Sequence, residues 1–164
     1  MNSSPGRSTP LRLLANSSTP ADYTPVSPST TSSNQYPACI IETISKIRLL
    51  DELDDNWDSY GGIKPTRKAL MGAFDVVYGL FVERTPMPSV FPVSNGGIQI
   101  EWSQFNIELE IEIASENDIS VYYHDLNTGE VSEYHVENNW EILGRLVNEL
   151  TNRNNPQNFV RAAV

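Results

Sequence analysis

The feature of this sequence that most constrains its fold is an alternation of apolar and polar residues in three stretches between positions 97 and 124. Successive side chains of a β-strand point to opposite faces of the sheet, so a period of two predicts strands with one buried and one exposed face. Glu108, Glu110 and Glu112 fall on the exposed face of the central stretch. The three stretches that follow this pattern are GIQIEW (97–102), NIELEIEI (106–113) and DISVYYH (118–124).

Two shorter stretches, 89–93 and 131–137, predict one more strand before and one after this core, and Pro92 favours a sheet edge for the first of them. Helical spacing of apolar residues surrounds the strands, with Thr66 as a predicted N-cap and Asn138 with Glu141 as a predicted capping box. The pattern predicts an α+β fold, in which an antiparallel sheet of four or five strands keeps one solvent face and packs on two N-terminal helices and one C-terminal helix. The predicted helices cover 39–53, 67–84 and the segment that begins at Asn138.

The 164 residues divide by composition into one domain and two tails. Residues 1–38 contain 14 Ser or Thr, six Pro and only four Leu, Ile or Val. Such a segment buries too little apolar surface to offset the entropy lost on ordering, so we predict that it is disordered. We predict a single α+β domain over 39–152 and a short C-terminal tail over 153–164.

The negative charge lies in the domain, because residues 1–38 carry a net charge of +1 and residues 39–164 a net charge of −11. An acidic surface repels phosphate backbones, which disfavours nucleic-acid binding and favours a basic protein partner. No apolar run approaches the length of a membrane span, and Cys39 is the only cysteine, which suits a reducing, cytoplasmic location. The same acidic balance also occurs in soluble proteins that use it for no specific contact.

The exposed face of the predicted sheet offers a candidate site. If SQFN (103–106) closes the first hairpin, Glu101 stands opposite Glu108. If ASEND (114–118) closes the next one, Ile113 stands opposite Ile119 and Glu108 stands beside His124. Two facing carboxylates raise one pKa and can prepare a general acid, and with a histidine they could hold a divalent metal. The alternative is that alternating Glu residues keep an exposed sheet face soluble and unpaired.

The second candidate is the segment DDNWDSYGGIKPT (54–66). In the functional interpretation, Trp57 and Tyr60 form aromatic platforms that contact a partner or a cationic or sugar-like ligand, with Asp55 and Asp58 beside them. In the structural interpretation, Asn56 and Asp58 cap a helix or make Asx turns, Gly61 and Gly62 supply positive φ, and the aromatic rings close one end of the core.

NWDSYGG followed by PSVFPVSNGGIQIEW and LEIEI resembles a group of small, uncharacterised bacterial proteins with the pattern NWD-x-YG … GGI-x-LEW … EIEI. The resemblance covers residues 53–113, and this chain has Ile100 where the pattern has Leu. It implies a bacterial-type protein in which the 54–66 segment and the GGIQIEW hairpin meet, with Trp57 close to Trp102. No activity, ligand or catalytic residue comes with it.

The sequence contains no phosphate-binding glycine loop, no nucleophile elbow and no metal-binding Cys–His spacing. We therefore expect a non-enzymatic interaction module without a cofactor, acting as an inhibitor or an antitoxin-like regulator of a basic partner. The alternative is a small enzyme, or a ligand or metal binder, that uses Glu101, Glu108 and His124. The oligomeric state is left open by the sequence.

Overall fold

The computed structural model describes residues 36–137 and 140–154. The predicted disordered tail, apart from its last three residues, lies outside this range, as do residue Asn138 of the predicted capping box and the chain after residue 154. The helices of the described part are α1 (Ala38–Asp51), α2 (Arg67–Leu80) and α3 (Glu141–Arg153).

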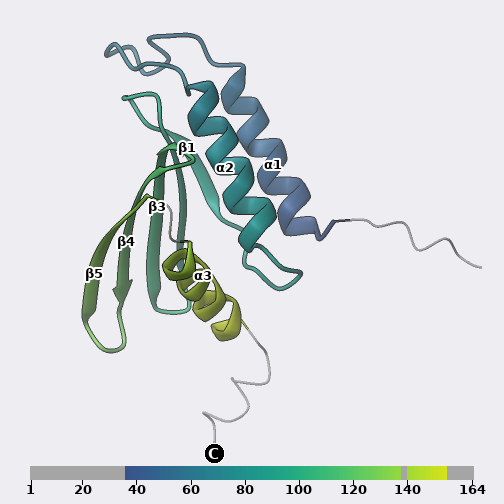
Figure 1. The fold of residues 1–164 in the computed structure, drawn as a ribbon, viewed down its shortest axis with the longest axis vertical. Coiled ribbons are helices and arrows are strands. Elements are labelled where there is room, and N and C mark those ends of the chain that lie inside the picture. Colours follow the sequence, from purple (N-terminus) through teal and green to yellow (C-terminus); the bar gives the residue numbers. More distant parts are fainter. Residues whose placement is uncertain (1–35, 138–139, 155–164) are drawn as a thin grey trace, which may run out of the picture. The chain divides into compact units, whose positions relative to one another are not determined.

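A five-stranded antiparallel sheet connects α2 to α3, and its strands lie side by side in the order of the chain. Two helices before the sheet and one after it confirm the predicted α+β architecture (Figure 1). Pro92 lies in the first strand, which within the described ranges pairs with the second strand alone and forms an edge as predicted. The strands are β1 (Ser89–Pro92), β2 (Ile98–Gln104), β3 (Ile107–Ser115), β4 (Asp118–Asp125) and β5 (Glu130–Val136).

The apolar positions of the alternating pattern form the inner face of this sheet, and the helices cover that face (Figure 1). Every predicted inward side chain of β2, β3 and β4 is buried, because the pleat sends each second residue into the same core. The indole of Trp102 lies deep in this core, where its Nε1–H donates a hydrogen bond to the carbonyl of Pro86 (2.8 Å). The inward residues are Ile98, Ile100, Trp102, Ile107, Leu109, Ile111, Ile113, Ile119, Val121 and Tyr123.

Helix α2 begins as predicted and ends four residues earlier than predicted. The hydroxyl of Thr66 accepts a hydrogen bond from the amide of Ala69 (3.1 Å), which confirms the N-cap. At the other end, Phe81 adopts extended backbone and packs its ring against Trp102, with ring centroids 5.5 Å apart. The helix therefore ends at Leu80, and Phe81 lies in the core beside Trp102.

Candidate functional site

The outer face of the sheet carries the polar positions of the same alternation. One row across the strands runs from Glu101 on β2 to Glu110 on β3, Tyr122 on β4 and Glu133 on β5. A neighbouring row aligns Glu112 with Ser120 and His135, and Glu108 with His124 begins the third. Both histidines of the chain therefore lie on this acidic sheet face, which we define by residues Glu101, Glu108, Glu110, Glu112 and Glu133.

Charge is segregated between the two layers of the fold. The five strands contain eight Asp or Glu residues and no Lys or Arg. The three helices contain six Lys or Arg and five Asp or Glu, so the helical layer is close to neutral. The negative charge of the domain is consequently concentrated on the sheet.

Neutral amide groups hold neighbouring carboxylates of the acidic sheet face together. Glu101 and Glu110 are direct cross-strand partners, and like charges in that position repel. The side-chain amide of Gln99 donates to Glu101 Oε2 (3.0 Å) and lies 3.4 Å from Glu110 Oε2, so one amide bridges both carboxylates. Asn95 makes a similar contact, because its Nδ2 donates to Glu112 Oε1 (3.1 Å).

A shallow depression of about 370 Å³ lies over this surface. Its lining combines carboxylates with Tyr122 and His135, so it offers negative charge and an aromatic ring side by side. Such a surface suits a cationic group better than a neutral or anionic one.

The predicted pairing of Glu108 with His124 is confirmed, since the two residues are cross-strand partners and His124 Nδ1 lies 3.1 Å from Glu108 Oε2. The expectation that Glu101 stands opposite Glu108 is wrong. Ser103 faces Glu108, and Glu101 faces Glu110. Within the described ranges, no group of three or more His, Cys, Asp or Glu side chains is placed to hold a metal ion.

The hairpin turn explains this difference. The four-residue turn SQFN was expected, but Phe105 and Asn106 alone close the hairpin, with φ of 56° and 57°. Two consecutive residues with positive φ form the tight turn whose twist matches that of paired strands. The shorter loop moves each cross-strand partner by two residues, which keeps every side chain on its predicted face and changes only its neighbour.

The segment 54–66 is a loop held by its own side chains. Asp58 Oδ1 accepts hydrogen bonds from the amides of Tyr60 (2.8 Å) and Gly62 (2.9 Å), which lowers the pKa of this carboxyl. Asn56 Oδ1 accepts from the amide of Gly61 (2.7 Å), and Gly61 has a φ of 91°. The predicted Asx turn is confirmed at Asp58, whereas the Asn56 side chain bonds an amide five residues on and so spans the loop.

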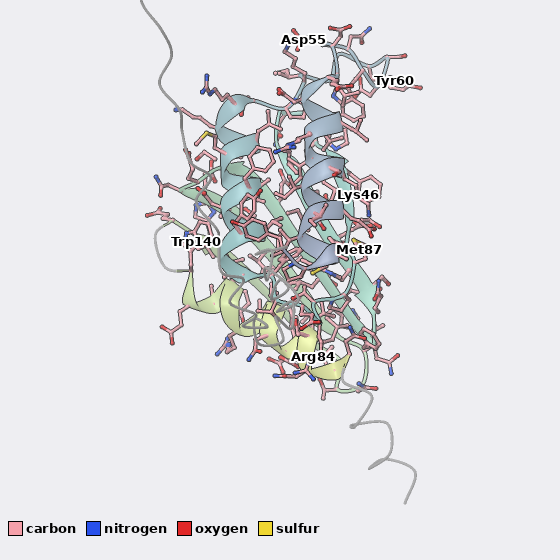
Figure 2. All side chains as sticks on the ribbon, turned by 90° about the vertical axis from the view of Figure 1, so that its right-hand side faces the viewer. Lys46, Asp55, Tyr60, Arg84, Met87 and Trp140 are labelled. Carbon is pink, nitrogen blue, oxygen red and sulfur yellow. The ribbon has the colours of Figure 1, made fainter. Side chains whose placement is uncertain are left out.

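The aromatic residues of this loop differ from each other. Trp57 is half-buried and donates its indole N–H to the carbonyl of Ile63 (3.2 Å). Tyr60 is 94% exposed, so the expectation that both rings close the end of the core is wrong for Tyr60. Figure 2 shows Tyr60 and Asp55 beyond the ends of the two helices, on the opposite side of the fold from Arg84 and Met87.

The predicted meeting of this loop with the hairpin region is confirmed at the turn before β2. The amide of Ile63 donates to the carbonyl of Ser94 (2.9 Å), and that of Thr66 donates to Gly96 (2.9 Å). The expected proximity of Trp57 and Trp102 is wrong. Trp102 packs beside Phe81 and Pro86, which follow α2, whereas Trp57 precedes it, and a helix of 14 residues spans about 20 Å.

A polar cluster that the sequence patterns do not predict lies where β4 meets α3. The Arg153 guanidinium donates to the Asp125 carboxylate and to Glu149 Oε1 (2.8 Å), and the Tyr123 hydroxyl donates to the same Glu149 oxygen (2.9 Å). Arg153 lowers the pKa of Asp125 to about 2. Burial, with the hydrogen bond to Glu149, raises the pKa of Tyr123 to about 12. The Glu149–Arg153 spacing of four was visible in the sequence, but its partner on β4 was not.

Comparison with known proteins yields no family model, curated protein or solved structure that matches this chain. The site is therefore interpreted from its own residues. In the described part of the chain, no helix combines the length and the apolar character needed to cross a membrane.

Proposed function

We propose that this protein is a non-enzymatic interaction module that binds a basic partner protein through its acidic sheet face. The observation that carries the proposal is the segregation of charge. Five carboxylates gather on the outer face, the strands contain no Lys or Arg, and the helical layer is nearly neutral. Clustered charge of one sign attracts an oppositely charged surface over several ångströms and sets the orientation in which the two proteins meet.

The geometry of the face supports contact with a protein surface. The depression of about 370 Å³ adds shape to the charge, and Tyr122 within it offers contact area at a low entropic cost. Its carboxylates would repel the phosphates of a nucleic acid. A module of this kind acts as an inhibitor or an antitoxin-like regulator when the basic surface that it covers is the working surface of its partner. The buried thiol of Cys39 fits a reducing, cytoplasmic location.

The 54–66 loop is a second proposed contact for the same partner. Tyr60 projects from a loop whose backbone is fixed by Asp58 and Asn56, so its ring is presented without the entropy cost of ordering the loop on binding. Trp57 supports the loop from within through its bond to Ile63.

The experiment compares proteins captured from lysate by the tagged full chain and by two double variants of equal charge. Glu110→Gln with Glu112→Gln neutralises the acidic sheet face, whereas Glu42→Gln with Asp75→Asn removes the same charge from exposed positions on α1 and α2. We expect a partner of net positive charge that the helix variant retains and the face variant loses. Each removed carboxylate should weaken binding by about two- to fivefold, which corresponds to about 0.4–1 kcal/mol per exposed ion pair.

Raising the salt concentration should weaken the wild-type complex, because exposed ion pairs are screened. Equal loss in both double variants would mean that only net charge matters and would contradict a specific face. Tyr60→Ala tests the loop separately, and an unchanged affinity would remove the loop from the interface.

A second candidate function uses the contact between Glu108 and His124. A carboxylate 3.1 Å from an imidazole nitrogen orients the ring and can assist proton transfer to a bound ligand. Glu108→Gln should abolish such chemistry while weakening a charge-driven partner complex only by the small factor expected for one carboxylate. The two functions are therefore separated by a single substitution.

A further inference from the structure

Strand β5 leaves one edge of the sheet open. It pairs only with β4 among the described residues, and alternate residues of an edge strand direct their N–H and C=O groups away from the sheet. Figure 1 shows β5 at the margin of the sheet farthest from α1 and α2. The seven residues of β5 include no proline and no lysine, and its pairing with β4 is regular, without a bulge.

The opposite edge is protected in ways that β5 lacks. Strand β1 is four residues long and ends in Pro92, whose nitrogen cannot donate a hydrogen bond. The ammonium group of Lys46 on α1 also donates to the carbonyl of Pro88 (2.7 Å), immediately before β1. Natural sheets protect edges with short strands, proline and lysine because a regular free edge pairs readily with another strand. The receptive edge of this sheet is therefore β5.

Depressions lie on both faces of the sheet beside this edge. The outer one, of about 370 Å³, includes Glu133 and His135 in its lining. The inner one, of about 300 Å³, lies between the sheet and α3 and includes Glu130 and Glu149. Because side chains of an added strand alternate between the two faces, such a strand would direct residues toward both depressions.

The negative charge along β5 favours a positively charged strand as its partner. Glu130 and Glu133 lie on the strand and Glu137 follows it, while the inner depression contains Arg145 as its single basic residue. A second copy of this chain, paired through its own β5, would bring the same carboxylates together, and like charges facing each other are destabilising. A strand rich in Lys or Arg matches this edge.

We propose that β5 accepts an extended basic segment of a partner protein as a sixth strand. Its backbone pairs with β5, and its cationic side chains reach Glu133 on the outer face and Glu130 on the inner face. Main-chain pairing gives such a complex affinity, and the pockets for alternate side chains give it specificity. This inference rests on the proposed function, because the same basic partner supplies the strand.

The test uses the full chain and two labelled ten-residue peptides. In the first, pairs of Lys alternate with pairs of Thr, so that Lys side chains lie on both faces of an added strand. The second has the same side chains with a methyl group on every amide nitrogen. Both carry the same charge, but the methylated peptide cannot donate backbone hydrogen bonds. We expect it to bind at least tenfold more weakly, which is about 1.4 kcal/mol. Hydrogen exchange should slow at every second amide of β5 when the unmethylated peptide binds.

The outcomes separate this inference from the function on which it rests. Equal binding of both peptides, lost in Glu110→Gln with Glu112→Gln and without protection of β5, would overturn strand addition and leave the acidic sheet face as the binding surface. Binding of neither peptide would overturn both. Protection of the β5 edge amides in the free chain would mean that another segment or a second copy already occupies the edge, and that result also overturns the inference.

Discussion

Two glycines of α2 allow a matched test of how the helical layer packs on the sheet. A Cβ added at Gly72 would lie 2.8 Å from Ile113 Cγ2 and 3.0 Å from the backbone of Ser115 and Glu116, at the end of β3. A Cβ added at Gly79 would meet only Trp140 Cζ3, at an ordinary 3.8 Å. The same substitution on one helix is therefore crowded at the first position and accommodated at the second.

Gly→Ala in a helix stabilises by about 0.8–1 kcal/mol through helix propensity, and this gain applies to both positions. Overpacking at Gly72 costs about 1–3 kcal/mol, because the backbone atoms of Ser115 and Glu116 cannot move aside as a side chain can. Gly79→Ala should then stabilise the protein by about 1 kcal/mol, and Gly72→Ala should destabilise it by about 0–2 kcal/mol.

Urea unfolding followed by circular dichroism measures the difference. With a slope near 2 kcal/mol per molar, a separation of about 2 kcal/mol places the two midpoints about 1 M apart. Equal midpoint shifts in the two variants would refute the close approach of α2 to the end of β3. A changed slope in one variant would show that the substitution alters the denatured ensemble or breaks two-state unfolding.

Two further predictions concern the polar cluster and the core. Arg153 lowers the pKa of Asp125 to about 2 in the folded protein, so this pair stabilises the fold above pH about 4, and the stabilisation is lost as the pH falls toward 2. Asp125→Asn should melt below the wild type at neutral pH and approach it at low pH, with Asp51→Asn as the charge control; a Tm difference that stays constant with pH would contradict this pairing. Trp102→Phe removes the N–H that donates to the Pro86 carbonyl and should destabilise the protein by about 1–3 kcal/mol in urea unfolding, whereas a loss below about 0.5 kcal/mol would mean that water replaces the bond.

The period-two pattern was sufficient to predict which side chains of the sheet are buried, because burial depends only on whether a residue occupies an odd or an even position in its strand. The predicted pairing of Glu108 with His124 is correct although the β3–β4 turn is shorter than the expected ASEND segment, because a bulge between Ile113 and Ser115 keeps Ile113 opposite Ile119. Glu101 was assigned to the wrong partner because the β2–β3 turn contains two residues and not four. The positive φ of Phe105 and Asn106 determines the two-residue turn. An asparagine before a strand is compatible with both the two-residue and the four-residue turn, so the sequence did not distinguish them.

In the 54–66 loop, too, the local hydrogen bonds were predictable from the sequence and the positions of the aromatic rings were not. Its Asp, Asn and Gly residues predicted Asx turns, because these side chains act on backbone groups a few residues away. The environment of each ring was not predictable from that chemistry. Trp57 turns back to the carbonyl of Ile63 while Tyr60 points to solvent, and the difference depends on how the loop meets the turn at Ser94 and Gly96.

The sequence by itself determined the fold class, the inner and outer faces of the sheet, the cap at Thr66 and the concentration of acidic residues in the strands. Each of these follows from residues close together in the chain, where the period of the backbone and the chemistry of one side chain are sufficient. Only the tertiary structure decided that Glu101 faces Glu110, that Arg153 reaches Asp125 and that β5, among the described residues, pairs with β4 alone. These contacts depend on turn conformation and on the packing of segments that are distant in the chain. Chains with the same local pattern can differ in both, so the local pattern alone does not determine the contacts.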